Sequence, residues 1–251
     1  MAEPESKPAC RPVGPGVLPP TIWERLETTP PNPRTTLTHA QIAAEAVALA
    51  DAEGLDAVSM RRLAERLGVA TMALYRYVKS KDELLELMVD AVAGPEPLAA
   101  DPSDWRAVFR EVARRHRVGV LAHPWLVAAN AQVPTLTPAR LQVAESMLTA
   151  LAPLPLTGEQ RMQVIRALNA IAGGAADLEA NQRMMLKARG HGEDGDIRLL
   201  LRSHMEWALR SGKYPMLVKT VQEGLAPVDP EQEFDLALDA MLDGLATRFG
   251  I

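Results

Sequence analysis

Apolar residues recur every three or four positions along most of the chain, which is the spacing of one face of an α-helix. Hydroxyl side chains tend to stand before these stretches, and glycine or proline tends to follow them, as at helix ends. No run alternates apolar and polar residues in the manner of a half-buried strand, and no repeat of fixed period is present. The pattern predicts an all-α protein.

Four closely spaced helices are predicted in the first half of the chain. Each begins at a hydroxyl side chain that can accept a hydrogen bond from a free backbone amide. The first and the fourth also carry the signature of a capping box. Three of the four end at a glycine that can take the left-handed conformation. The predicted segments run from Thr38 to Gly54, Ser59 to Gly68, Thr71 to Val78 and Ser80 to Gly94.

The third of these helices is too short to be stable alone, so it must pack against its neighbours. Leu74 and Val78, four positions apart, form its expected buried pair. Tyr75 and Tyr77 therefore cannot both be core residues. A helix that ends at a glycine, a tight turn and a short helix with exposed polar and aromatic residues are typical of a helix-turn-helix, whose second helix enters the major groove of DNA.

Proline and glycine divide the rest of the chain. Residues 1–33 hold nine of the 20 prolines, which predicts a disordered arm, although Ile22 to Leu26 could form one helical turn. Residues 34–94 are the predicted helix-turn-helix domain, and residues 103–251 a second helical domain. Its predicted helices cover 104–122, 138–151, 157–187, 195–211 and 231–249, with a possible short helix after Pro124.

Charge is distributed unevenly. The 251 residues carry a net charge of −5, so the chain as a whole is not basic like a protein that coats a polyanion. Residues 59–81, in contrast, include six basic residues and one acidic residue, a net charge of +5. Any nucleic-acid contact is therefore expected from this local patch.

Other chemistry is scarce in the sequence. The single cysteine, Cys10, excludes an intrachain disulfide and a thiolate zinc site, and no two histidines have the spacing of a zinc-binding helix. Neither a nucleotide-binding glycine motif nor a nucleophile elbow is present, which argues against an enzyme and against a cofactor. No apolar run is long enough for a membrane helix, and no secretory signal is evident. A cytoplasmic protein is expected.

The helix-turn-helix segment, residues 37–92, resembles the DNA-binding domain of the TetR family of one-component repressors. The motifs that carry this resemblance are Glu53-Gly54-Leu55, Arg62-Leu63-Ala64, Leu67-Gly68-Val69, Leu74-Tyr75 and "KSKDELL" at 79–85. Further along, "HPWLVAANAQVPTLTPARLQVAESMLTAL" is similar to the effector domain of the tetracycline-repressor branch, which extends the resemblance to about residue 250. Ala70 stands where the family usually has a serine cap, so Thr71 is the alternative cap.

The resemblance implies DNA-backbone contacts at Tyr75, Tyr77 and Lys81. A tyrosine hydroxyl can bond a phosphate oxygen, and such contacts fix the position of a helix on the duplex. Lys81 stands at the predicted start of a helix, where the helix dipole also favours phosphate. The alternative is a solvated face with structural tyrosines.

Arg61 and Arg76 are the candidates for reading base edges, because a guanidinium can bind guanine O6 and N7 together. Phosphate contact by the same two arginines is the alternative. Thr71 and Met72 are candidates for contact with thymine methyl groups. The complete predicted DNA-binding set is Thr38, Ser59, Arg61, Thr71, Met72, Tyr75, Arg76, Tyr77 and Lys81.

A ligand pocket is predicted in the second domain, where methionine and tryptophan are concentrated. Ordinary core packing is the alternative explanation for most of these residues. The tetracycline-binding members hold a metal chelate through a set of side chains that has no match here, so tetracycline is not predicted. The predicted pocket residues are Trp105, His116, Trp125, Asn130, Met147, Asn169 and His204.

A dimer interface is predicted on helices 157–187 and 231–249. Small residues on the first permit close approach of another helix, and the apolar arc of the second is wide enough for burial on two sides. In the family these two helices form a four-helix dimer bundle; packing within one chain is the alternative. The predicted residues are Ala170, Gly173, Gly174, Asp177, Leu238, Met241, Leu242 and Leu245.

These observations predict a homodimeric transcriptional repressor that binds a palindromic double-stranded DNA operator and is released by a small molecule. A constitutive or architectural DNA-binding regulator without an inducer is the main alternative, and a small all-α enzyme is a third. No membrane, metal or cofactor is expected to take part.

Overall fold

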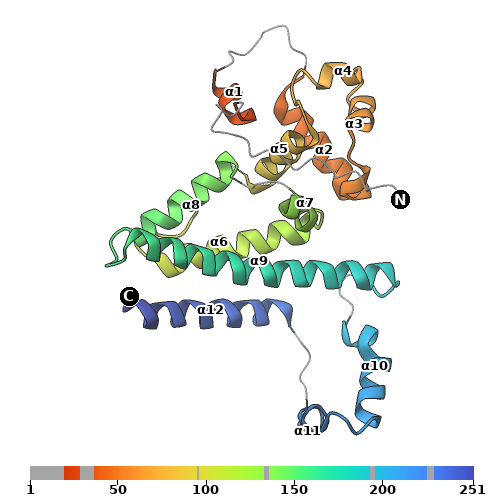
Figure 1. The fold of residues 1–251 in the computed structure, drawn as a ribbon, viewed down its shortest axis with the longest axis vertical. Coiled ribbons are helices and arrows are strands. Elements are labelled where there is room, and N and C mark those ends of the chain that lie inside the picture. The colour runs from red at the N-terminus through yellow and green to blue at the C-terminus, as the bar shows by residue number, and fades with distance from the viewer. Residues whose placement is uncertain (1–19, 29–36, 95, 133–135, 193–195, 225–228) are drawn as a thin grey trace, which may run out of the picture. The chain divides into compact units, whose positions relative to one another are not determined.

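The computed structural model describes residues 20–28, 37–94, 96–132, 136–192, 196–224 and 229–251 (Figure 1). The described residues form twelve α-helices and one 3-10 helix, η1, with no strand among them, which confirms the all-α prediction. The chain divides into two units, Met1–Thr35 and Thr36–Ile251. The helices are α1 (Ile22–Thr28), α2 (His39–Glu53), η1 (Leu55–Ala57), α3 (Met60–Arg66), α4 (Thr71–Leu74), α5 (Lys81–Ala93), α6 (Trp105–Ala122), α7 (Leu126–Gln132), α8 (Pro138–Leu151), α9 (Gly158–Ala188), α10 (Arg198–Arg210), α11 (Pro215–Gln222) and α12 (Pro230–Phe249).

The first unit contains α1, which lies where the sequence allowed one helical turn from Ile22 to Leu26 and extends it to Thr28. The Thr21 hydroxyl accepts a hydrogen bond from the Glu24 amide at 3.2 Å, and the Glu24 carboxylate accepts one from the Thr21 amide at 2.7 Å. This reciprocal pair is a capping box, which satisfies free amides at the start of α1. Residues 1–19 and 29–33 lie outside the described residues.

Helix α2 opens the predicted helix-turn-helix domain of the second unit, residues 37–94, which is called the DNA-binding part below, and the predicted capping box is in place. The Thr38 hydroxyl accepts from the Gln41 amide at 3.1 Å, and the Gln41 side chain accepts from the Thr38 amide at 2.8 Å. Apolar side chains of α2, α3, α4 and α5, and of the turn after α4, form the buried interior of this part, and most of them are fully buried. They include Ile42, Ala46, Leu49, Leu63, Leu74, Val78, Leu84, Leu85 and Met88.

Helix α4 is shorter than predicted. It ends at Leu74, and turns continue the chain to Val78, whose amide bonds the Leu74 carbonyl at 3.0 Å. Leu74 and Val78 are both fully buried, as predicted. Ala70 occupies the N-cap with an extended backbone and no side-chain cap bond, so the alternative that Thr71 caps the helix is wrong. Thr71 is already the first helical residue.

The rest of the second unit is built on α9, which packs against α6, α8 and α12 (Figure 1). The bounds predicted for α6, α8, α9 and α12 are confirmed to within one residue, and α7 is the short helix expected after Pro124. Side chains of these helices form one apolar core. The most deeply buried of them are Phe109, Ala113, Leu151, Val164, Leu168, Leu238 and Leu242.

Helices α10 and α11 differ from the others because neither contains a buried residue. Trp207 is 54% exposed and Met216 68% exposed. Helix α11 was not predicted, although Pro215 stands at its first turn, where proline is favoured. In the described ranges, no helix is both long and apolar enough to cross a lipid bilayer.

Candidate nucleic-acid interface and effector interior

The surface of α4 presents large side chains to solvent. Met72 is 74% exposed and Tyr75 is 42% exposed, although both are bulky apolar or aromatic residues. Arg76 follows them and is exposed as well. Because Leu74 is the buried anchor of this short helix, its neighbours point outward by helical geometry. The exposed polar and aromatic surface predicted around α4 is therefore present, and its contact with DNA stays a prediction.

Ion pairs neutralise part of the positive charge that the sequence places in residues 59–81. Arg62 bonds the Glu53 carboxylate at 2.7 and 2.9 Å, and Arg66 pairs with Glu45. These two arginines join α3 to α2, and carboxylates of the same domain largely compensate their charges. The net charge of residues 59–81 overstates what is available to DNA, because both acidic partners lie outside that range.

Four cations remain available for DNA. Arg61 pairs with Glu65 at 3.2 Å, but the two side chains are 76% and 60% exposed, so water screens the pair strongly. Arg76, Lys79 and Lys81 have no ion-pair partner among the residues that the structure describes. These four side chains are the cationic surface around α4 and the start of α5.

Lys79 was absent from the predicted DNA-binding set. It stands just before Ser80, the N-cap of α5, and two positions before Lys81, the first residue of that helix. Free backbone amides and the helix dipole favour an anion at this end of a helix. The paired lysines around the cap were the available signal in the sequence.

Tyr77 is held differently from Tyr75. The His39 Nε2 donates to the Tyr77 carbonyl oxygen at 3.1 Å, and the two rings meet edge to face with their centres 5.4 Å apart. Tyr77 is therefore half-buried, whereas Tyr75 projects into solvent. His39 was not among the predicted site residues, because its contact with Tyr77 spans 38 positions of sequence.

Thr38 and Ser59 lie at the N-termini of α2 and α3, where their hydroxyls serve as helix caps. The Ser59 oxygen accepts a hydrogen bond from the Arg62 amide at 3.3 Å. Each hydroxyl oxygen has a second lone pair, so capping leaves room for a further contact. Their contact with DNA stays a prediction.

Two of the predicted pocket residues lie beside a half-buried arginine in the effector part, which is the part of the chain from α6 to α12. Arg140 of α8 donates to the Asn130 side chain at 2.8 Å. His116 of α6 faces Gly173 of α9, where an added Cβ would lie 3.9 Å from its Nε2. The missing side chain at position 173 leaves the imidazole uncovered on that side. Helices α6, α7, α8 and α9 thus bring polar side chains together.

This interior has unused hydrogen-bonding capacity. One carboxylate oxygen of Asp177 is buried without a hydrogen-bond partner among the described residues. Burial lowers the pKa of His116, the charge of Arg140 lowers it further, and the charge of Asp177 acts in the opposite direction. His116 is therefore neutral at pH 7, with one ring nitrogen able to donate and the other able to accept.

The other predicted pocket residues are not gathered there, which corrects the prediction. Trp105 packs edge-on against Phe109 with ring centres 5.7 Å apart, and Met147 is also a core residue. Asn169 and His204 are exposed on the outer faces of α9 and α10. Sequence spacing defines faces of a helix but does not say which face meets a neighbour.

Trp125 is buried at the junction with α2, where its indole nitrogen bonds Asp51 at 2.7 Å. A separate hollow of about 210 Å³ opens between Pro97 to Pro102 and α8. None of the predicted pocket residues lines this hollow.

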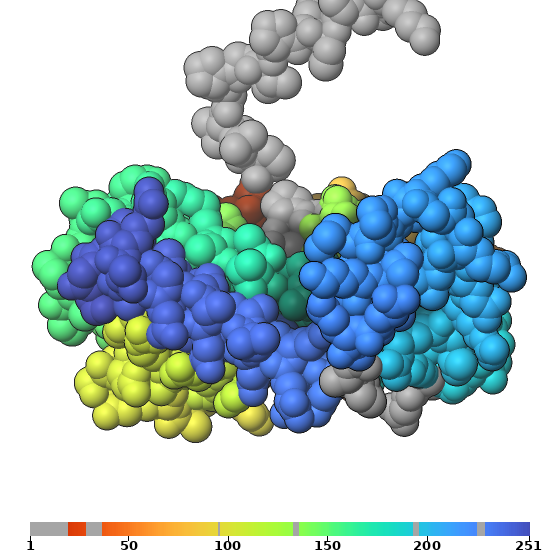
Figure 2. Space-filling model, turned by 90° about the horizontal axis from the view of Figure 1, so that it is seen from below, coloured from red at the N-terminus to blue at the C-terminus, as the bar shows by residue number. Residues whose placement is uncertain are grey.

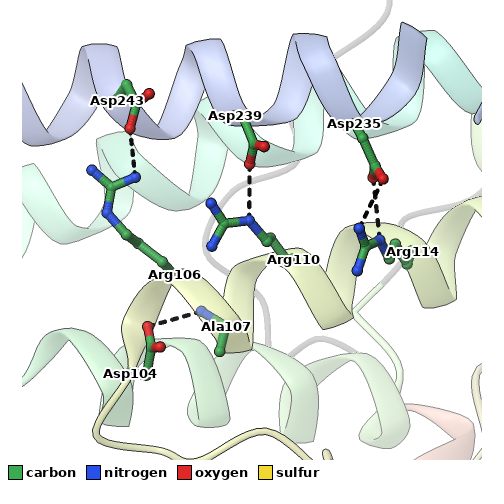
Figure 3. Close-up of polar contacts among 8 residues, drawn as sticks. All are labelled: Asp104, Arg106, Ala107, Arg110, Arg114, Asp235, Asp239 and Asp243. Atoms are coloured by element: carbon green, nitrogen blue, oxygen red, sulfur yellow. Dashed lines mark hydrogen bonds and ion pairs between the residues drawn. The ribbon is translucent and has the colours of Figure 1, made fainter. Parts of the chain in front are cut away.

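Three ion pairs join α6 to α12 (Figure 3). Arginines at every fourth position of α6 face aspartates at every fourth position of α12, and the two helices run in opposite directions. The four-residue spacing of opposite charges on both helices is the sequence signal from which these pairs could have been predicted. The pairs are Arg106–Asp243, Arg110–Asp239 and Arg114–Asp235, each with a guanidinium nitrogen 2.8 Å from a carboxylate oxygen.

The predicted dimer residues fall into two groups. Leu238 and Leu242 are 1% and 0% exposed because they pack into the core of their own chain, which corrects their assignment to a dimer surface. Met241 and Leu245 are partly buried against the same core, and Gly173 and Asp177 belong to the His116 interior. Ala170 and Gly174 lie exposed on α9.

Comparisons with known proteins agree with this arrangement. Residues 42–88 match the model of "Bacterial regulatory proteins, tetR family", and residues 96–249 match "Tetracyclin repressor-like, C-terminal domain". The HTH-type transcriptional repressor DrrR1 of Streptomyces coeruleorubidus is 34% identical over 226 residues, which cover 89% of this chain and 83% of that protein.

Two further proteins are similar over most of their length. An HTH-type transcriptional regulator of Saccharopolyspora erythraea is 31% identical over 242 residues, covering 93% of this chain and 94% of that protein. The crystal structure of the TetR family protein ActR of Streptomyces coelicolor in complex with actinorhodin has a TM-score of 0.70 and 28% identity. The structural match covers 86% of this chain and 100% of the ActR chain.

Proposed function

Because the chain belongs to the TetR family of bacterial regulatory proteins, it is a ligand-responsive DNA-binding repressor, and we propose that it acts as a homodimer on a palindromic operator. The observation that carries this proposal is the exposed surface of α4, where Met72, Tyr75 and Arg76 project into solvent. Two lysines close by in sequence, Lys79 and Lys81, have no ion-pair partner within the described ranges. A dimer would place two such surfaces one turn of duplex apart, or a multiple of it.

Within each half-site, Arg76 and Arg61 read base edges. Both side chains are exposed and carry the planar group that binds guanine O6 and N7 together. Thr71 and Met72 contact thymine methyl groups from the first turn of α4. In this proposal the arginine contacts supply most of the preference for one sequence over another.

Phosphate contacts fix α4 on the duplex. Tyr75 and Tyr77 bond phosphate oxygens through their hydroxyls, and Lys79 and Lys81 add cationic contacts beside the N-terminus of α5. Thr38 and Ser59 complete the set at the N-termini of α2 and α3. These contacts do not depend on sequence, so they contribute equally to every duplex and weaken as salt rises.

A small lipophilic molecule is the proposed effector, bound between α6, α8 and α9. Core side chains of these helices supply an apolar wall, while His116, Arg140 and Asp177 supply hydrogen-bonding groups whose capacity is not fully used. Apolar walls with a few convergent polar groups are typical of small-molecule sites. The related protein ActR was solved with actinorhodin, which supports a natural product of this general kind.

The proposed dimer surface combines the exposed faces of α9 and α12. Leu178 is 60% exposed on α9 and Leu236 is 71% exposed on α12, unlike the buried leucines on the opposite side of α12. Ala170 and Gly174 on α9 have no long side chain, so a second helix can approach closely. Figure 2 shows α12 crossing this face of the molecule with α9 visible alongside it.

One linked set of measurements tests the proposed function. A duplex is first selected from a random pool with the purified protein, and lipophilic natural products are then screened for a rise in melting temperature. A true effector must weaken binding of the selected duplex by the same factor by which the duplex weakens binding of the effector, typically ~5-fold or more. A chain that selects a duplex whose affinity no binding compound changes would instead be a constitutive regulator.

A further inference from the structure

Two helices of the DNA-binding part carry an aspartate in their last turn, which is an electrostatically unfavourable position. Asp51 lies in the last turn of α2 and Asp90 in the last turn of α5, and neither helix has a basic residue there. The C-terminal end of a helix carries a partial negative charge, so a carboxylate is disfavoured unless another group compensates it. For both aspartates the compensating groups come from the effector part of the chain.

Asp51 receives two of these groups on one oxygen. The indole nitrogen of Trp125 donates to its Oδ1 at 2.7 Å, and the Nδ1 of His123 lies 2.8 Å from the same atom. A carboxylate accepts only, so the histidine nitrogen is the donor. Trp125 is 5% exposed, and a buried indole N–H needs an acceptor. The junction between α6 and α7 is thereby fastened to the end of α2.

Asp90 receives the third group. Its Oδ1 accepts a hydrogen bond from the backbone amide of Ala139 at 2.8 Å, in the first turn of α8. That amide has no partner within its own helix. Thr137, at the N-cap of α8, makes no cap bond, and its hydroxyl is buried without a partner among the described residues. Helix α8 is therefore capped by a residue of the DNA-binding part.

Helix α2 connects the Asp51 contact to the DNA-reading surface. Its first residue, His39, donates to the Tyr77 carbonyl just after α4. Twelve positions separate His39 from Asp51, which corresponds to ~18 Å of rigid helix. One end of α2 is thus fixed to the effector part and the other to the segment that follows α4.

We propose that Asp51 and Asp90 are positioning residues that hold the DNA-binding part in one orientation on the effector part. Two separate attachment points prevent the rotation that a single one would allow. The inference rests on the proposed function, because only in a dimer does this orientation set the distance between the two α4 surfaces. It also gives the effector a route to DNA, since Arg140 of the polar interior directly follows Ala139 on α8.

A distance measurement within one chain tests the orientation directly. Spin labels are attached through Met72→Cys and Val118→Cys, whose native side chains are 74% and 62% exposed, with Cys10→Ser removing the native thiol. The labelled chain is diluted into unlabelled protein so that only intrachain distances are read. The distance distribution is expected to be narrow in this background and distinctly broader when Asp51→Ala or Asp90→Ala is added.

Two matched variants separate positioning from general stability. Asp51→Asn keeps the accepting oxygen and is expected to restore the narrow distribution. Glu53→Ala, two positions further along α2, breaks the pair with Arg62 inside the DNA-binding part and is expected to leave the distribution narrow. A distribution as narrow in Asp51→Ala and Asp90→Ala as in the parent would overturn the proposal.

DNA binding without the labels gives the functional measurement. On a duplex selected with the wild-type protein, Asp51→Ala is expected to lose ~5-fold or more in affinity, the lower end of typical couplings between sites. On the same duplex with one half-site scrambled, the loss is expected to be much smaller. Equal losses on both duplexes would contradict the positioning role. If the wild-type protein selects no duplex, the proposed function fails, while the spin-label distances still decide the orientation.

Discussion

The DNA-binding part and the effector part of the chain use the same kinds of residue in different ways. Around α4, buried and exposed residues alternate within a few positions, and the caps of α2, α3 and α5 come from adjacent side chains. In the effector part, partners are far apart in sequence, as for Arg110 and Asp239, which are 129 positions apart. Local sequence therefore specifies the reading surface, whereas the effector interior depends on how long helices pack.

The largest expected effect separates the two faces of α12. Leu242→Ala should lower the free energy of unfolding by ~2–5 kcal/mol, because the side chain is fully buried in the effector core and its removal leaves a cavity. Urea unfolding monitored by circular dichroism measures the change. A loss below ~1 kcal/mol would mean that the site is not a packed core position.

Leu236→Glu is the matched change on the exposed face of the same helix. Leu236 is 71% exposed within one chain, so the variant should still fold and keep the wild-type helical content in circular dichroism. In the proposed dimer the new charge would be buried without a partner, so the variant should be monomeric in light scattering. A dimer as stable as that of the wild type would remove this face from the interface.

A smaller stabilising effect is expected at the N-terminus of α4. Ala70 occupies the N-cap without a side-chain hydrogen bond. Ala70→Ser supplies an acceptor for a free amide and should raise the free energy of unfolding by ~0.5–2 kcal/mol. Thermal unfolding of the two proteins side by side measures this, and an unchanged or lower melting temperature would show that the position does not function as an N-cap.

The ion pairs between α6 and α12 should each contribute less. Arg110 and Asp239 are 33% and 51% exposed, so a double-mutant cycle of Arg110→Ala and Asp239→Ala should give a coupling of ~0.2–1 kcal/mol that decreases at high salt. The more exposed pair of Arg202 and Glu206 within α10 is the control and should give less. A coupling that salt does not change would argue against an electrostatic contact.

The smallest effect concerns pH and His116. Burial lowers the pKa of this histidine in the folded state from the ordinary value of 6.5, so the unfolded chain binds more protons between the two values. The part of the free energy of unfolding that depends on neutral His116 is therefore fully present above pH 6.5. It is lost as the pH falls below 6.5, because the unfolded chain then takes up the proton more readily than the folded one. Compared with His116→Gln, the wild-type protein should lose more free energy of unfolding between about pH 7 and about pH 5. Parallel pH profiles for the two proteins would refute the shift.

Most of the fold could be predicted from the sequence because its signals are local. The capping box at Thr38 and the buried pair of Leu74 and Val78 each depend on residues within four positions of one another. The exposed position of Tyr75 followed from the same pair. Helix α11 was missed because it is short and has no buried face.

The contacts of single side chains could be predicted less well. Asn169 and Leu242 lie on helices whose bounds were correct, yet one is exposed and the other fully buried. Which face of such a helix meets a neighbour depends on residues far away in sequence, such as Arg117 and Glu179, which are 62 positions apart. The contacts of Asp51 with His123 and Trp125 could not be inferred for the same reason, since none of the three residues has an unusual local pattern.

The central claim is that the surface of α4 reads DNA while the lysines around the cap of α5 anchor it. Binding of Arg76→Ala and Lys81→Ala to a selected duplex and to a random duplex, across a range of salt concentrations, tests it most directly. Arg76→Ala should lose ~1–3 kcal/mol on the selected duplex and little on the random one, whereas Lys81→Ala should weaken both alike and reduce the salt dependence by about one ion. If both variants bound both duplexes as the wild-type protein does, this surface would not be the DNA interface.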